Sequence, residues 1–109
     1  MYNSIKTDKT YRVYRIRSVV DVESFTDGAL VLRLKDRQMF ELNSTARDVL
    51  IHTDGKRTAG EVANAMMVDY HITSLGEALQ DVIELYDHLT AQGIVEAVKD
   101  NEIERRSKS

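Results

Sequence analysis

The sequence predicts an α+β fold, a three-stranded antiparallel β-meander followed by three α-helices. In residues 19–25, acidic residues alternate with valines, which is the period of a half-buried strand. After Asn43 the apolar residues recur every three or four positions, which is the period of an amphipathic helix. Short polar links separate the first three segments, so consecutive strands are expected to be antiparallel neighbours.

The predicted strands cover residues 19–25, 29–34 and 38–42. The first is rich in β-branched residues. Asp27 and Gly28 follow it and predict a tight hairpin turn, because both residues tolerate the positive φ that such a turn needs. Leu30, Leu32 and Leu34 are expected on one face of the second strand.

The predicted helices cover residues 44–52, 58–70 and 74–92. Asn43 is a favoured N-cap for the first helix. Thr58 and Ser74 each precede a glutamate by three positions, so each predicts a capping box at the start of a helix. Gly93 supplies a left-handed residue that would end the last helix.

The last two helices are joined by about four residues, as in a helix-turn-helix, and the whole pattern is winged-helix-like. Residues 18–98 are expected to form this domain. Residues 1–17 form a basic N-terminal arm, expected to be partly disordered, although a loose strand within residues 10–17 stays open. Residues 94–95 are expected to be extended, and residues 99–109 form a charged C-terminal tail.

Composition narrows the functional classes. The 109 residues include no cysteine, which excludes a disulfide scaffold and a thiolate nucleophile. No apolar run is long enough to span a bilayer and no signal peptide is evident, so a cytoplasmic location is expected. Residues 1–18 carry a net charge of +4 within a chain of net charge −3, so the remainder is acidic.

The chain offers no arrangement typical of catalysis. His52, His71 and His88 fall at a predicted helix end, in a loop and inside a helix, without metal-ligand spacing. The five glycines are scattered and form no phosphate-binding loop. We therefore expect no enzymatic activity, no metal and no cofactor.

Winged helices often bind DNA through the second helix of the helix-turn-helix. Here that helix contains four acidic residues and no lysine or arginine, so it would repel the phosphate backbone. Peptide recognition is favoured instead: if residues 38–42 form an edge strand, an extended peptide can add to it beside the last helix. Because Met39 and Phe40 are adjacent, their side chains are expected on opposite faces of the sheet.

The chain also resembles the PqqD family, the pyrroloquinoline-quinone synthesis D proteins and related precursor-peptide recognition elements. Four segments carry the resemblance, in order along the chain: Gly28 with residues 42–46, residues 54–62, Tyr70 with residues 81–82, and residues 93–96. No one of these segments is specific, but their order and spacing are typical of the family.

The resemblance implies that the domain binds the leader of a ribosomally made precursor peptide as an added strand. It also implies delivery to a separate modifying enzyme, often of the radical S-adenosylmethionine type. On this sequence the groove maps to Gln38, Met39, Phe40, Glu41, Leu42, Leu75, Ala78, Leu79, Val82, Leu85 and Tyr86. Replacing Val82 by arginine is expected to obstruct this groove without unfolding the domain.

Two alternatives stay open at this stage. One is a DNA-binding regulator with the same fold, in which the basic arm contributes non-specific affinity. The other is a self-associating module, in which edge strands or the arm pair between two copies in a homodimer.

Overall fold

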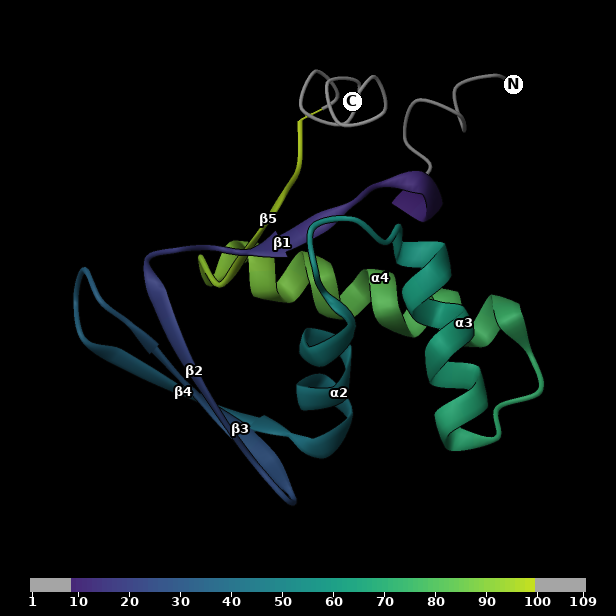
Figure 1. Ribbon diagram of the computed structural model, residues 1–109, viewed down its shortest axis with the longest axis horizontal. Coiled ribbons are helices and arrows are strands. Elements are labelled where there is room, and N and C mark those ends of the chain that lie inside the picture. Colours follow the sequence, from purple (N-terminus) through teal and green to yellow (C-terminus); the bar gives the residue numbers. More distant parts are fainter. Residues whose placement is uncertain (1–8, 100–109) are drawn as a thin grey trace.

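The computed structural model describes residues 9–99 and confirms the predicted α+β architecture (Figure 1). The elements in chain order are η1 (Lys9–Tyr11), β1 (Tyr14–Ile16), β2 (Val20–Phe25), β3 (Gly28–Arg33), β4 (Gln38–Asn43), α2 (Ser44–His52), α3 (Ala59–Tyr70), α4 (Leu75–Ala91) and β5 (Val95–Ala97). The three predicted strands are β2, β3 and β4, and the three predicted helices are α2, α3 and α4.

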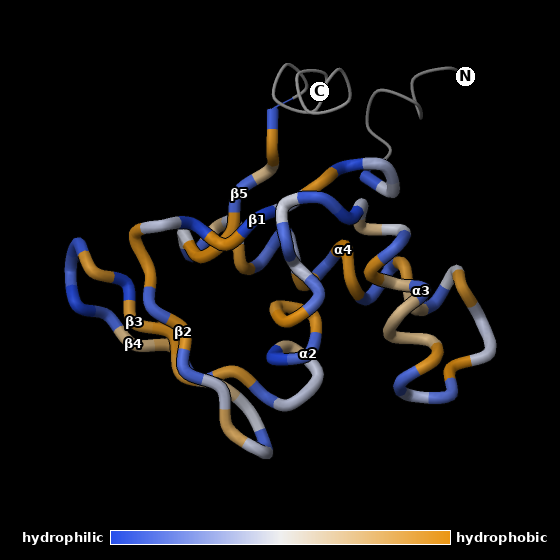
Figure 2. The backbone as a smooth tube through the Cα atoms, viewed as in Figure 1, coloured by the Kyte–Doolittle hydropathy of each residue, from blue (hydrophilic) through white to orange (hydrophobic). Residues whose placement is uncertain are grey.

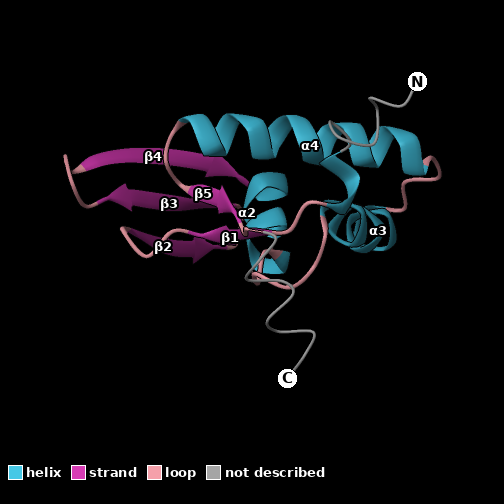
Figure 3. Ribbon diagram, turned by 90° about the horizontal axis from the view of Figure 1, so that it is seen from above, coloured by secondary structure: helices cyan, strands magenta, loops and turns pink. Residues whose placement is uncertain are grey.

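Strands β2, β3 and β4 form an antiparallel sheet in sequence order. In Figure 3, α2 lies between the sheet and α3, and α4 runs above α2 and α3. Val31 at the centre of β3 is fully buried, opposite Val22 on β2 and Phe40 on β4. This inner face of the sheet therefore packs on the helices and forms one wall of the core.

The hairpin between β2 and β3 differs in detail from the prediction. Phe25 pairs with Gly28, so the turn consists of Thr26 and Asp27, and neither Asp27 nor Gly28 has a positive φ. Gly28 is needed for another reason. A Cβ atom at this position would lie 2.2 Å from the backbone oxygen of Leu42, so only glycine lets β4 approach so closely.

A second, two-stranded sheet joins the two ends of the described chain, where β1 pairs antiparallel with β5. Val13 and Tyr14 are buried in the core. Although residues 1–17 are expected to form an arm outside the domain, these two residues belong to the packed body. Short apolar stretches among arginines gave too weak a pattern to reveal this. The expectations for residues 1–8 and 100–109 concern residues outside the described part of the chain.

The predicted helix caps are largely confirmed. The Asn43 side chain accepts a hydrogen bond from the Ala46 amide at 2.8 Å. Thr58 forms the full capping box that was predicted for it. Ser74 forms only half of one: its hydroxyl accepts from the Glu77 amide, without a described return bond to the Glu77 carboxylate. Gly93 follows Gln92, the C-cap of α4, and has a φ of 78°, as expected for the glycine that ends a helix.

Candidate peptide-binding groove

The most distinctive feature of the surface is the free edge of β4. This strand is last in the order β2-β3-β4, and no other described strand pairs with its outer edge. Backbone N–H and C=O groups along such an edge are available to one more strand. The predicted edge position of residues 38–42 is therefore confirmed in the described part of the chain, where β4 extends to Asn43.

Side chains of β4 alternate between the two faces of the sheet. Phe40 and Leu42 point inward and are partly buried against the core cluster. Met39 is exposed on the opposite face, where it pairs across the sheet with Leu32. Met39 and Phe40 thus lie on opposite faces, as the sequence predicted. Only the inward-pointing side chains, Phe40 and Leu42, can line a groove between β4 and the helices.

A mostly apolar hollow of about 230 Å³ opens next to the end of β4, among the three helices. It begins at Thr45, two residues beyond the strand, and reaches Val49 on the same helix. Its complete lining is Thr45, Val49, Met66, Tyr70, Ile72, Ala78, Asp81, Val82 and Leu85. No residue of β4 lines the hollow, which begins just beyond the end of the strand whose edge is open.

The residues predicted on α4 separate into two groups. Ala78, Val82 and Leu85 line the hollow, whereas Leu75 and Leu79 do not. Val82 is only 3% exposed, because it is also part of the core. An arginine at Val82 would bury an unpaired charge, so the expectation that this substitution spares the fold has no support in the packing.

Tyr86, also predicted to line the groove, lies in the core one turn beyond Val82 on the same face of α4, and it does not line the hollow. Its ring stacks on Tyr14 of β1 with centroids 4.0 Å apart. Its hydroxyl shares a 2.7 Å hydrogen bond with the hydroxyl of Thr53, which also donates to the Val49 carbonyl. Burial raises the pKa of Tyr86 to about 12. Tyr86 therefore ties α4 to α2 and β1 and contributes no surface to the hollow.

Sequence reasoning missed the part of the lining that comes from α2 and α3. Thr45 and Val49 lie one turn apart on α2, which gives them one face of that helix. Met66 and Tyr70 have the same spacing on α3, and this repeat was a usable signal. The sequence could not show that both faces turn toward α4.

Asp81 is the one charged residue in the lining, and it is exposed at the rim of the hollow. Among residues 9–99 it has no ion-pair partner. Tyr70 at the far side donates from its hydroxyl to Asp48 at 2.6 Å, and this bond, with help from Arg47, lowers the pKa of the Asp48 carboxyl. The hollow thus combines apolar walls with one unpaired carboxylate.

The opposite end of the space between β4 and α4 is closed by Arg33. Its guanidinium donates to the Gln92 carbonyl at 2.5 Å and lies 5.1 Å from the centre of the Phe40 ring. Asp36 accepts two further bonds from the same group, which lowers the pKa of its carboxyl to about 2. This contact fixes the C-terminal end of α4 against the sheet, so the groove opens toward Asp81.

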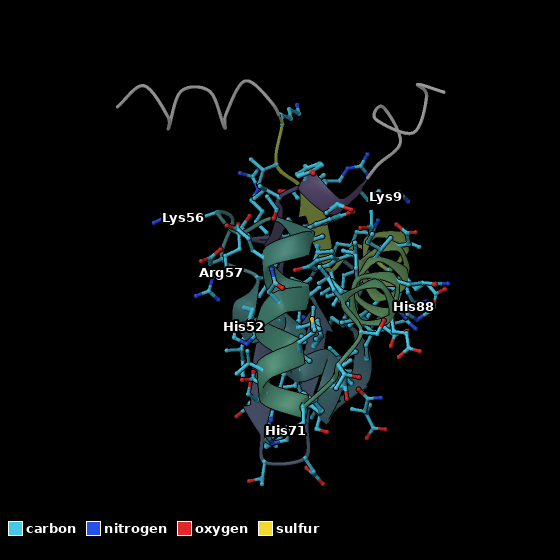
Figure 4. All side chains as sticks on the ribbon, turned by 90° about the vertical axis from the view of Figure 1, so that its right-hand side faces the viewer. Lys9, His52, Lys56, Arg57, His71 and His88 are labelled. Carbon is cyan, nitrogen blue, oxygen red and sulfur yellow. The ribbon has the colours of Figure 1, made fainter. Side chains whose placement is uncertain are left out.

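Nothing in the described residues resembles a catalytic or metal site. His52, His71 and His88 come from three different elements and do not converge (Figure 4). No three histidine or carboxylate side chains among residues 9–99 are placed to hold a metal ion. In the same range no helix has the length and hydropathy needed to cross a bilayer.

The family model for coenzyme PQQ synthesis protein D matches residues 28–95, well over half of the chain. The chain belongs to the PqqD family. Members of this family are non-catalytic peptide-binding domains, so the predicted class of function is confirmed. The matched residues include β4, the three helices and the hollow between them. No curated protein matches the chain at a significant level.

Two solved structures share the fold of this PqqD-family domain. One is TbiB1 in complex with the TbiA(beta) leader peptide, with a TM-score of 0.70 and 16% identity over 79% of this chain and 99% of that chain. The other is a lasso peptide synthetase B1 complexed with the leader peptide, with a TM-score of 0.66 and 19% identity over 76% of this chain and 96% of that chain. Each of these two structures contains a bound leader peptide.

Proposed function

We propose that this chain binds the leader segment of a ribosomally made precursor peptide and presents it to a separate modifying enzyme. The observation that carries the proposal is the free edge of β4 beside the apolar hollow. In β-strand addition, main-chain hydrogen bonds supply affinity and side-chain pockets supply specificity, and this surface offers both.

The hollow defines which leader residues would be recognised. A peptide strand beside β4 points every second side chain toward the helices. One such side chain, bulky and apolar, would enter the hollow between Val49 and Leu85. A lysine or arginine two positions away, on the same side of the peptide strand, would meet the unpaired carboxylate of Asp81 at the rim.

Charge weighs against the DNA-binding alternative. In a helix-turn-helix, α4 would enter the major groove, yet it carries no lysine or arginine. Its acidic residues, Glu77, Asp81, Glu84 and Asp87, are all exposed. Nothing else in the described residues favours binding of a duplex through this helix.

The modifying enzyme is the expected second partner of the domain. The domain has no described catalytic cluster, so modification of the peptide would need another protein. A radical S-adenosylmethionine enzyme is the type that we propose, on the basis of the family resemblance. A cytoplasmic location is part of the same proposal, because ribosomally made precursors are produced in the cytoplasm.

The proposal is tested by titration with the leader segments of small precursor peptides found by sequencing the genes around this one, using wild-type protein and two matched variants. Thr45→Arg places bulk and charge at the mouth of the hollow, at an exposed position, and is expected to weaken binding at least tenfold. Ile51→Arg adds the same charge to a 61% exposed position of the same helix, away from the hollow, and should bind like wild type. Equal affinities of all three proteins would refute the groove assignment.

A further inference from the structure

The outer face of the sheet, turned away from the helices, carries an uncovered apolar surface. All of the helices lie on one side of the sheet (Figure 1). On the bare side, Phe25, Leu34 and Met39 are 46%, 47% and 59% exposed. Leu30 and Leu32 stand between them on the central strand and are partly exposed. These five side chains, with the acidic residues beside them, are called the outer face below.

The central strand has the composition of a strand that is covered on both sides. Apolar residues follow one another along β3 almost without interruption (Figure 2). Such runs are typical of strands buried on both faces, whereas a strand with one solvated face normally alternates. A hollow of about 440 Å³ lies on the outer face, lined by Asp21, Val22, Glu23, Leu30, Leu32 and Met39. A folded monomer seldom exposes such a continuous surface without a partner for it.

The charged residues that pair with the leucines of this surface are all acidic, and Lys35 and Arg37 lie in the turn beyond Leu34. Leu30 pairs with Glu23 on one neighbouring strand and Glu41 on the other, and Leu32 pairs with Asp21. All three acids are exposed. The nearest strand cation, Arg33, lies on the inner face over Phe40. A second copy of this chain would bring the same three carboxylates against them, so charge repulsion disfavours a symmetric dimer here.

We propose that the outer face docks a second protein whose contact surface has an apolar centre and a rim of lysine or arginine. This second protein is inferred to be the enzyme that modifies the bound peptide. The identity of the second protein rests on the proposed function. A peptide added to β4 extends the sheet by one strand. Every second side chain of that peptide would then stand on the outer face beside Met39, within reach of a protein docked there.

The probe for this surface is a synthetic amphipathic helical peptide of leucine and lysine, compared with a twin in which glutamate replaces every lysine. Titration of ¹⁵N-labelled protein should give saturable shifts in β2 and β3 with the lysine peptide alone. Raising the salt should weaken this binding several-fold, because exposed charges are screened. Asp21→Asn/Glu23→Gln and Leu30→Thr/Leu32→Thr should each weaken it about tenfold.

Matched controls separate this inference from leader binding. Glu77→Gln/Glu84→Gln removes two exposed charges from α4 and should leave probe affinity unchanged. The Asp21→Asn/Glu23→Gln protein should still bind the leader, and Thr45→Arg should still bind the probe. If the wild-type protein does not bind the leader, the proposed function is refuted, but the outer-face assignment is not. Shifts concentrated on α4, or equal binding of both probe peptides, would overturn the outer-face assignment.

Discussion

At the scale of single residues, Gly28 decides how closely β4 can approach its neighbour. A methyl group there would lie 2.2 Å from the Leu42 backbone oxygen, and backbone cannot rotate aside as a side chain can. We predict that Gly28→Ala destabilises the domain by roughly 2 kcal/mol, within the upper range for single substitutions. Urea unfolding provides the measurement.

Gly76→Ala is the matched control. A Cβ at this helical position meets nothing closer than the Ser74 hydroxyl at 3.9 Å. Alanine should therefore raise stability by up to about 1 kcal/mol, because glycine is the poorer helix former. Equal stabilities of the Gly28→Ala and Gly76→Ala proteins would contradict the close-approach argument.

Tyr86 links stability to alkaline pH. Its pKa is raised by burial to about 12, from an ordinary value near 10, so the folded state favours the protonated phenol. The resulting stabilisation is complete below pH 10 and is lost as the pH rises toward 12. Tyr86→Phe should cost about 1 kcal/mol at pH 7, because the hydrogen bond to Thr53 is lost. It should also flatten the decline of stability above pH 10, measured by denaturant unfolding.

Residue-scale prediction from sequence succeeded where the direction of a side chain follows from its strand. The opposed directions of Met39 and Phe40 needed only the period of a strand. The prediction that Tyr86 lines the groove was wrong. Apolar residues recur every three or four positions on a helix whether that face packs in the core or lines a groove, so the sequence pattern does not distinguish the two. Its stacking partner Tyr14 lies in a segment whose place in the core the sequence did not reveal.

At the scale of elements, the N-termini of α3 and α4 differ in how many hydrogen bonds their capping residues form. Thr58 takes part in two reciprocal bonds with Glu61, whereas Ser74 accepts one from Glu77. We predict that Thr58→Ala costs more stability than Ser74→Ala, by a few tenths to about 1 kcal/mol. Thermal unfolding followed by circular dichroism would check this. A larger loss for Ser74→Ala would contradict the capping geometry.

Strands and helices were predictable because their periods are local properties of the chain. Asn43 marked the change from strand to helix within one residue, and its cap geometry confirms it. The hollow was only partly predictable, because its lining is assembled from three helices. Residues such as Thr45 and Met66 meet only after α2 and α3 pack against α4.

At the scale of the whole molecule, the β1–β5 pair joins the ends of the described chain. Tyr14, which pairs with Ala97 in this sheet, is buried and stacks on Tyr86 of α4. We predict that Tyr14→Ala destabilises the domain by about 3 kcal/mol or more, the usual cost of removing a buried aromatic ring. Tyr11→Ala, at a 76% exposed position nearby, should change stability little. Similar unfolding curves for both variants would show that β1 lies outside the cooperative core.

The binding mode is the central claim, and amide hydrogen exchange along β4 tests it most directly. In the free protein, the β4 amides that point to the open edge should exchange quickly, while those bonded to β3 stay protected. Saturation with the leader peptide should slow the open-edge amides by tenfold or more, because each gains a main-chain hydrogen bond. Tight binding with unchanged exchange in Gln38–Asn43 would contradict strand addition.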